Sequence, residues 1–371
     1  MSVPPLDGAA LASALARPAI VGMTPQRYPD PSGLRLDLNT NLFGPNPAVA
    51  QVAAALAEGR LDLTQYPQSD AAGLRSAYAK HLHVGPEQLC FGNGSDEMID
   101  LLFKAYVDPT EVVAWAVPTF SMYRFYATVA GARVVEASFG PSFSLPEEEL
   151  LAARPKVLVL CSPNNPTGSA VATSQMYRLA TLLRDRPTAE GGPGLLVLDE
   201  AYGEFGGAHH ASSIAAHPNL VVLRTLSKAM GLAGARIGMA IADGAVMDRI
   251  AAVKPPFNLN EVSIALAHAA LDHLPWVEQV AMTVVQERQW LAQQLQSRGY
   301  VVHPSSANFL LVRPPGEVDE VVRRLAAAGL VVRHFPHQPA LAGHVRLTVP
   351  PREVGQRLLA VIDTMGGSDG R

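Results

Sequence analysis

The sequence predicts an α/β protein with a large lobe, built on a mostly parallel sheet with helices on both faces, and a smaller α+β lobe. Between residues 88 and 242, continuous apolar runs alternate with helical segments, which is the pattern of strands buried on both faces. The pair Pro255 and Pro256 then interrupts this pattern. The length of 371 residues is also that of two domains, or of one large domain with a smaller lobe.

An N-terminal arm, residues 1–44, comes first and is predicted to belong partly to the small lobe. It contains a short amphipathic helix at 11–15, a proline-rich stretch at 25–31 and, over 36–47, a strand that runs into a turn. Because a proline-rich arm rarely folds by itself, we expect it to lie across a neighbouring domain or subunit.

The large domain, predicted at residues 45–254, is read from apolar runs and from the turn residues that bound them. We expect strands at 89–91, 112–116, 134–135, 157–161, 195–198, 220–223 and 239–242, and helices at 48–56, 71–81, 123–130 and 174–184, with one more that follows the glycines after 91 and ends at 106.

The small domain, predicted at residues 255–371, begins with a long helical region whose polar face carries glutamines. Shorter alternating elements follow, which is typical of a compact α+β lobe. We expect helices at 262–298, 318–328 and 353–365, and strands at 308–312, 330–333 and 345–349.

Composition and charge exclude several classes of protein. The net charge is −4 and only 17% of residues are charged, without a basic run, so we expect no nucleic-acid partner. Cys90 and Cys161 lie in apolar, strand-like segments and are interpreted as reduced core cysteines. The N-terminus lacks the pattern of a signal peptide, and no stretch is long enough to cross a membrane. We therefore expect a cytoplasmic protein with no membrane partner, and we predict no metal site.

The stretch around Lys228 is the first candidate for chemistry. It follows the apolar run 220–223 in a chain with only five lysines. A lysine can form an imine with a carbonyl compound, and the neighbouring hydroxyls together with Arg236 suit an anionic group such as a phosphate. Together they point to an aldehyde that bears a phosphate, namely pyridoxal 5′-phosphate (PLP). An ordinary solvated lysine after a strand fits this stretch equally well.

Three more loops follow predicted strands, where open α/β sheets bind ligands. In the loop 92–97, glycines before a helix let backbone N–H groups approach an anion and Ser95 adds a hydroxyl, although a plain helix cap explains it too. In the loop 163–168, two prolines fix a turn from which an asparagine can bond a cofactor hydroxyl, and Asn–Pro bonds are candidates for cis geometry. A surface turn has a similar composition.

The third loop begins with Asp199 at the end of the apolar run 195–198. A buried carboxylate is costly unless it is paired, and a pyridinium N–H would be such a partner, which makes the PLP ring an electron sink. Tyr202 could reach a ring substituent. The alternative is that Asp199 caps a helix.

With these four loops in chain order, the sequence resembles fold-type I PLP enzymes of the class I/II aminotransferase superfamily, and within it the histidinol-phosphate aminotransferase branch. The resemblance runs from about residue 36 to the C-terminus. The segments that carry it are 66–67, 92–97, 118–123, 163–168, 199–202, 224–228, 232–238, 306–309, 332–335 and 345–348.

The resemblance implies a role for each matching residue on the cofactor side. Lys228 would be the internal aldimine lysine and would carry a proton between Cα and C4′, and Asp199 would pair with the pyridine nitrogen. Asn165 and Tyr202 would bond the 3′-oxygen, and Phe120 would stack on the ring. Tyr66 would reach the cofactor phosphate from the partner subunit of a homodimer with shared active sites. The residues that would hold the phosphate within one subunit are Gly94, Ser95, Asp96, Thr225, Ser227 and Arg236.

On the substrate side the resemblance implies that Arg346 clamps the α-carboxylate and that Arg333 faces a distal phosphate, with surface ion pairs as the alternative for both. Asn41 and Tyr28 are further candidates there. Two departures from the branch fall on this side: 41–43 lacks the usual acidic, proline-containing run, and Pro350 stands where glycine is usual.

The implied reaction is transamination through Lys228 between an amino donor, first L-histidinol phosphate, and 2-oxoglutarate, within amino-acid biosynthesis. An aromatic amino acid, or one from a specialised pathway, is the second option for the donor. A third option is another PLP reaction on the same scaffold, such as decarboxylation of a phosphorylated amino acid. A PLP-fold regulator is not favoured, because no DNA-binding extension is present.

Overall fold

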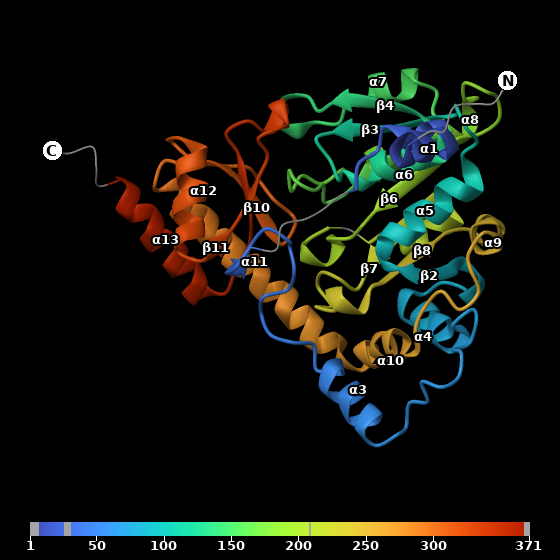
Figure 1. Cartoon of the computed structure of the whole chain (residues 1–371), viewed down its shortest axis with the longest axis horizontal. Helices are drawn as coiled ribbons and strands as arrows, with labels where there is room; N and C mark the ends of the chain where they lie inside the picture. The colour runs from blue at the N-terminus through green and yellow to red at the C-terminus, as the bar shows by residue number, and fades with distance from the viewer. Residues whose placement is uncertain (1–6, 26–30, 208, 367–371) are drawn as a thin grey trace.

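The computed structural model describes residues 7–25, 31–207 and 209–366, and it shows a large and a small lobe connected by a long helix (Figure 1). The large lobe is built on a seven-stranded sheet in the order β2-β8-β7-β6-β5-β3-β4, in which only β8 runs antiparallel to its neighbours. The predicted mostly parallel sheet is therefore confirmed. The strands are β2 (Leu89–Asn93), β3 (Val112–Val117), β4 (Arg133–Ser138), β5 (Val157–Cys161), β6 (Leu195–Asp199), β7 (Leu220–Thr225) and β8 (Ile237–Ile241).

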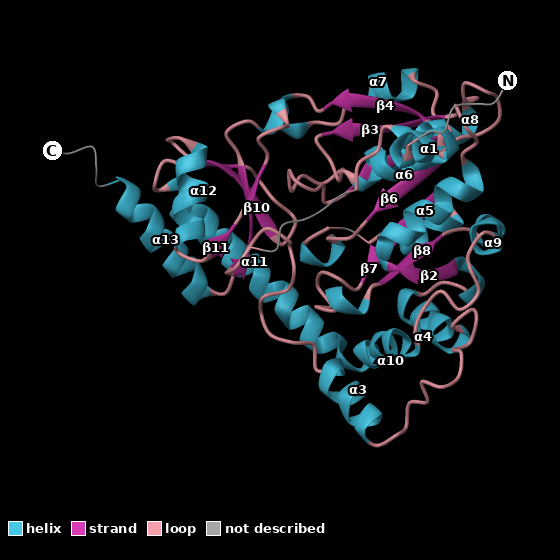
Figure 2. Cartoon of the chain, in the orientation of Figure 1, coloured by secondary structure: helices cyan, strands magenta, loops and turns pink. Residues whose placement is uncertain are grey.

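Helices cover both faces of this sheet, because the buried strands are apolar on both sides (Figure 2). Val157 and Val159 pack in one core cluster with α5, α6 and α9, whereas Leu158 and Leu160 pack in another with α4, α8, α10 (Glu261–Ala270) and α11 (Leu274–Gln296). The helices of the large lobe are α3 (Ala48–Ala57), α4 (Ala72–Leu82), α5 (Gly94–Tyr106), α6 (Met122–Ala130), α7 (Glu147–Ala152), α8 (Thr173–Asp185) and α9 (Gly244–Ala252).

The small lobe is α+β, as predicted. Its four-stranded sheet has the order β12-β13-β10-β9 and is antiparallel throughout. The helices α12 and α13 pack on each other, and α13 also packs on α11. The elements are β9 (Val301–Val302), β10 (Phe309–Arg313), α12 (Val318–Ala327), β12 (Arg333–His334), β13 (Val345–Thr348) and α13 (Arg352–Gly366).

The predicted helical region 262–298 consists of α10 (Glu261–Ala270) and α11 (Leu274–Gln296), separated by a short 3₁₀ turn. α10 packs against α3 and α4 of the large lobe, and α11 then continues toward the small lobe (Figure 1). At the start of the described chain, α1 (Gly8–Leu15) is followed by α2 (Pro18–Val21), which packs on α6. The domain boundaries 1–44, 45–254 and 255–371 stay a prediction.

The strand that was predicted to begin at Leu36, and to run into a turn by residue 47, lies earlier in the structure. The arm forms β1 (Leu34–Arg35), which pairs in parallel with β11 (Leu330–Val331) of the small lobe. The Leu36 N–H still donates to the Val331 carbonyl at 2.7 Å. Asn39, however, has a left-handed φ of 54°, which ends the extended conformation. The chain therefore turns here instead of lengthening the strand.

None of the helices in the described part of the chain is both long enough and apolar enough to cross a membrane.

Candidate active site

A cavity of about 390 Å³ lies at the carboxyl ends of the central strands. One side of it is lined by the last residues of β5, β6 and β7, which are Cys161, Asp199 and Thr225. This is where open α/β sheets place their ligands. The small lobe and the arm close the other side, with Asp37, Leu38, Asn39, Thr40, Arg333, Phe335, Gln338 and Arg346.

Most of the residues singled out from the sequence meet in this cavity. Those that line it are Gly94, Ser95, Asp96, Phe120, Asn165, Asp199, Tyr202, Thr225, Ser227, Lys228, Arg236, Arg333 and Arg346. Two candidates lie outside its lining, namely Asn41 and Tyr66. Tyr28 falls within residues 26–30 and lies outside the described residues.

Asn41 stabilises a turn instead of facing the cavity. Its Oδ1 accepts from the Phe43 N–H at 2.9 Å, and its Nδ2 donates to the Gly44 carbonyl at 3.1 Å. The left-handed turn at Asn39 directs Asn39 itself toward the cavity. Both asparagines stand in the motif 39–44, and only the backbone conformation distinguishes them, so the sequence offered no signal for choosing Asn39.

Lys228 follows β7 and presents its amine to the cavity. The Nζ donates to the Leu38 carbonyl at 3.2 Å and lies 5.6 Å from the centre of the Tyr202 ring. Burial, together with the nearby Arg346 cation, lowers the pKa of Lys228 to about 8. Because the neutral amine is the nucleophile, a lowered pKa suits a lysine that condenses with an aldehyde.

Asp199 is 2% exposed at the end of β6. Its Oδ2 accepts from the Tyr123 hydroxyl at 2.6 Å and its Oδ1 accepts from the Ala201 N–H at 3.0 Å. Burial raises the pKa of Asp199 to about 6, against the effect of these two hydrogen bonds. A carboxylate offers about four acceptor positions, so capacity remains for a cationic N–H in the cavity.

Tyr123 is a partner of Asp199 to which sequence reasoning assigned no role. It is fully buried on α6, and burial together with the Asp199 carboxylate raises the pKa of its hydroxyl well above the usual value. It lies within the motif 118–123, but an aromatic residue on the apolar face of a helix is usually a core residue. Its contact with Asp199 depends on the packing of α6 against the sheet.

The start of α5 forms an anion-binding corner. Gly94 has φ of 75°, a left-handed conformation that favours glycine, and a Cβ there would lie 2.6 Å from the Arg236 Nη2 and displace the guanidinium. The hydroxyls of Thr225 and Ser227 are 3.0 Å apart at the same end of the cavity. A helix N-terminus, two hydroxyls and a cation together suit a phosphate.

Asp96 is the acidic member of this corner. Its Oδ2 lies 3.3 Å from the Arg236 Nη2, whereas its Oδ1 is buried without a hydrogen-bond partner among the described residues. Burial raises the pKa of the Asp96 carboxyl. The corner is therefore incomplete by itself, as expected of a site that a ligand completes.

Arg346, on β13, is a buried cation with no ion-pair partner among the described residues. Its guanidinium donates to the Asn165 Oδ1 and to the Asp37 carbonyl, and its Nε has no hydrogen-bond partner in the described part of the chain. Burial lowers the pKa of Arg346 to about 10. A buried arginine without a carboxylate suits an anionic substrate.

The turn that carries Asn165 is fixed by its neighbour Asn164. The Asn164 Nδ2 donates to the Pro118 carbonyl at 3.0 Å, and its Oδ1 accepts from the Thr119 hydroxyl at 2.6 Å. The peptide bond between Asn165 and Pro166 is cis, as the sequence indicated was possible. The loops after β3 and β5 therefore hold each other at the edge of the cavity.

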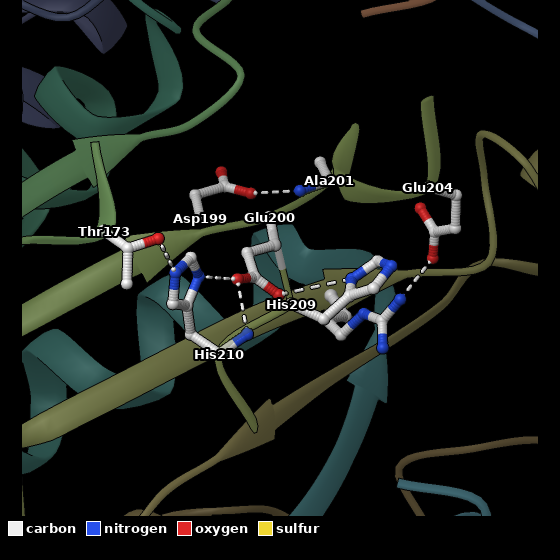
Figure 3. Close-up of polar contacts among 8 residues, drawn as sticks. Thr173, Asp199, Glu200, Ala201, Glu204, His209 and His210 are labelled. Carbon is white, nitrogen blue, oxygen red and sulfur yellow. Dashed lines mark hydrogen bonds and ion pairs between the residues drawn. The ribbon is translucent and has the colours of Figure 1, made fainter. Parts of the chain in front are cut away.

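A second polar network lies beside the cavity and outside its lining (Figure 3). The Glu200 Oε1 accepts from the His210 N–H at 3.0 Å and lies 2.6 Å from the His210 Nδ1. The His210 Nε2 lies 3.0 Å from the Thr173 hydroxyl. Arg224 pairs with Glu204 at 2.6 Å nearby. Sequence reasoning missed this network, because its members lie far apart in the chain.

The cavity fits three groups of PLP, namely its aldehyde, its ring nitrogen and its phosphate. Lys228 offers an amine of lowered pKa to the aldehyde, and Asp199 offers a buried carboxylate to the ring nitrogen. The N-terminus of α5 and Arg236 offer a cradle to the phosphate. The chemistry of the side chains at each position matches the group that it would meet.

Comparison with known proteins also points to an aminotransferase. The model of the family described as aminotransferase class I and II matches residues 31–362. Histidinol-phosphate aminotransferase of Roseiflexus castenholzii is 36% identical over 339 residues, which is 89% of this chain and 88% of that protein. The chloroplastic histidinol-phosphate aminotransferase of Nicotiana tabacum is 33% identical over 334 residues, or 88% and 77% of the two chains.

Solved structures share the fold. Histidinol-phosphate aminotransferase of Sinorhizobium meliloti in complex with PLP superposes with a TM-score of 0.82 at 24% identity and covers 95% of this chain and 98% of its own. An aspartate aminotransferase mutant of Thermus thermophilus gives 0.75 at 26% identity, covering 89% and 95%. L-threonine-O-3-phosphate decarboxylase of Porphyromonas gingivalis gives 0.75 at 22%, covering 88% and 100%.

Proposed function

Since this chain belongs to the class I and II aminotransferase family and is a PLP-dependent transaminase, we propose that its amino donor is L-histidinol phosphate and its acceptor 2-oxoglutarate. The names of the curated relatives support the donor. The single observation that carries the proposal is the cavity in which Lys228 and Asp199 lie within reach of two arginines, Arg333 and Arg346.

The two arginines suit both substrates. Histidinol phosphate has a phosphate and no carboxylate, so Arg346 and Arg333 would hold its phosphate together. The two cations are close enough that Arg333 contributes to the lowered pKa of Arg346. In 2-oxoglutarate, by contrast, two carboxylates would each take one arginine. Planar guanidinium groups bind both kinds of anion in a bidentate manner.

The residues that line the cavity would bind different parts of the cofactor and move a proton. When bound, PLP supplies an aldehyde carbon that condenses with amines and a ring that accepts the electron pair left on the substrate Cα. Asp199 would keep the proton on the ring nitrogen, and the Asn165 amide would bond the 3′-oxygen beside Tyr202. The Lys228 amine, with its pKa lowered to about 8, would be the base that takes the Cα proton.

A panel of amino donors tests this proposal. Purified enzyme with bound PLP is mixed with one equivalent of histidinol phosphate, phenylalanine, tyrosine, a basic amino acid or O-phosphothreonine, without a keto acid. We expect the fastest conversion to the pyridoxamine form with histidinol phosphate. An aromatic amino acid that reacts faster would assign the enzyme to that donor. Release of carbon dioxide without any need for a keto acid would make it a decarboxylase.

The substitution Arg333→Gln tests the substrate side alone. We expect KM for histidinol phosphate to rise about 10-fold or more, because a charge-assisted hydrogen bond to phosphate is lost. Arg352→Gln is the matched control, since Arg352 pairs with Glu287 at 2.7 Å on the surface, remote from the cavity lining. Equal KM values for both variants would remove Arg333 from the substrate site.

We also propose a cytoplasmic homodimer in which Tyr66 reaches the cofactor phosphate of the partner subunit. Tyr66 is 82% exposed, and its ring stacks on Phe257 with centres 4.9 Å apart. Sedimentation at twice the chain mass of 39.4 kDa is expected, together with weaker cofactor retention in Tyr66→Phe. A monomer that retains PLP equally well with either residue would contradict this arrangement.

A further inference from the structure

Asn39 is a buried residue of the arm that contacts the catalytic machinery. It is 1% exposed, and its Nδ2 donates to the Tyr202 hydroxyl oxygen at 3.1 Å. Its φ of 54° is left-handed, a conformation that asparagine tolerates better than most residues. The backbone therefore adopts an uncommon conformation at the residue whose side chain enters the cavity.

The small lobe holds Asn39 in place. The Asn39 N–H donates to the Thr348 hydroxyl at 3.0 Å, and the Asn39 carbonyl accepts from the Asn308 Nδ2 at 3.0 Å. The Thr348 hydroxyl in turn donates to the Leu36 carbonyl at 2.8 Å. The hydrogen bond from Asn39 to Tyr202 therefore connects the small lobe to a residue of the large lobe.

The side-chain amide of Asn39 decides which partner donates in its hydrogen bond with the Tyr202 hydroxyl. The NH₂ end of an asparagine can only donate, so the Tyr202 oxygen must be the acceptor of this bond. The Asn39 Oδ1 lies on the other side, 3.5 Å from the Thr348 hydroxyl. The Tyr202 hydroxyl proton is therefore not used in the bond with Asn39. Because Tyr202 lines the cavity, this proton can be donated to a group in the cavity.

We propose that Asn39 is a positioning residue that turns the Tyr202 hydroxyl into a hydrogen-bond donor toward the 3′-oxygen of the cofactor. This rests on the proposed role of Tyr202 at that oxygen. A bond accepted by a hydroxyl polarises it and strengthens the bond that it donates. Asn39 thereby favours negative charge on the 3′-oxygen. It also lowers the pH at which the cofactor, bound to Lys228, loses the proton that is shared between the 3′-oxygen and the Lys228 nitrogen.

The test is a pH titration of the absorption spectrum of the holoenzyme without substrate. Asn39→Gly keeps the left-handed backbone and removes the donor. Asn39→Asp keeps the shape and replaces the donor by a carboxylate, which would accept a hydrogen bond from the Tyr202 hydroxyl and turn that hydroxyl away from the cofactor. We expect the spectral midpoint to rise by about half to one pH unit in Asn39→Gly, the size of one lost hydrogen bond, and by more in Asn39→Asp.

A double-mutant cycle separates positioning from a general structural effect. In Tyr202→Phe, which lacks the hydroxyl, Asn39→Gly is expected to shift the midpoint by less than about a third of its effect in the wild type. An equal shift in both backgrounds would overturn the inference, as would a midpoint unchanged by Asn39→Gly or by Tyr202→Phe. If Asn39→Gly does not fold, the same cycle is made with Asn39→Ala, which also removes the donor and adds no charge.

The other charged and titratable groups that line the cavity, or that contact Asp199, are the same in wild type and Asn39→Gly, so they cannot produce the difference. They are Asp37, Asp96, Tyr123, Cys161, Asp199, Lys228, Arg236, Arg333 and Arg346. The titration needs no amino donor. Failure of the donor panel with histidinol phosphate would therefore leave this inference standing, and failure of the cycle would leave the donor assignment untouched.

Discussion

Asp199 and Glu200 are neighbours at the end of β6 and both are buried, yet they meet different surroundings. Asp199 faces the cavity, where Tyr123 and Ala201 supply two hydrogen bonds and leave acceptor capacity free. Glu200 lies outside the cavity lining and takes two hydrogen bonds from His210 (Figure 3). Burial is thus the same for both carboxyls, and their partners decide their roles.

Glu200 and Asp199, on the two sides of the end of β6, have different charged neighbours. On the Glu200 side, His210 bonds one carboxylate oxygen. The other oxygen, Oε2, lies 4.0 Å from the His209 Nδ1 and has no hydrogen-bond partner among the described residues. On the Asp199 side, Arg346 is buried without an ion-pair partner among the described residues. The Asp199 side is called open here because this cation lines the cavity, where a ligand can pair with it, and the Glu200 side is called closed because Glu200 lies outside the cavity lining.

The largest effect is expected from Lys228→Ala, on the open side. Loss of both the attachment point and the base should lower kcat/KM for the preferred donor by about 10⁴-fold or more. Lys104→Ala is the control, because Lys104 is an exposed lysine paired with Asp100 at 2.5 Å. Steady-state kinetics with added PLP measures both variants. Comparable activities would break the assignment of the cavity.

Asp199→Asn is expected to lower kcat by about 10²- to 10³-fold, because an amide cannot keep the ring nitrogen protonated. The shape of the side chain is preserved, so the fold should be retained. The measurement is kcat at saturating donor, with circular dichroism as the check on folding. A variant that keeps wild-type turnover would show that Asp199, like its neighbour, has only a structural role.

The lowered pKa of Lys228 makes a prediction for the cofactor-free protein. A lysine with a pKa of about 8 gains neutral amine about tenfold per unit as the pH rises toward 8 and levels off above it, whereas an ordinary lysine continues to gain up to about pH 10. The initial rate of acetylation at Lys228, followed by mass spectrometry of its peptide, should show this plateau. A rate that still rises tenfold per unit above pH 9 would refute the lowered pKa.

The smallest effect on catalysis is expected on the closed side. Glu200→Gln should leave kcat within about twofold of wild type, because Glu200 is outside the cavity lining. It should lower the free energy of unfolding by about 1–3 kcal/mol, because the hydrogen bond to His210 loses its charge. Urea denaturation of the holoenzyme measures this loss. A drop in kcat as large as that of Asp199→Asn would erase the distinction between the two carboxyls.

The sequence allowed the sheet to be predicted, and also the grouping of the expected cofactor-side residues around one cavity, because these signals are local. An apolar run followed by a loop with Asp199 or Lys228 places that residue at a strand end without knowledge of the tertiary structure. The contacts of Tyr123 and Glu200 required the packing of α6 and of the loop at His210. Asn39 was overlooked for Asn41 because a left-handed turn has no unique sequence signature.

The arm described above also has a consequence for the order of folding. The N–H of Asn39 bonds a hydroxyl that lies 309 positions later in the chain. During synthesis the arm leaves the ribosome well before its partners in β11 and β13 are made. Contacts of such long sequence separation are slow to form. The large lobe can therefore collapse on its own sheet first, and the cavity acquires its last wall only after β13 has been made.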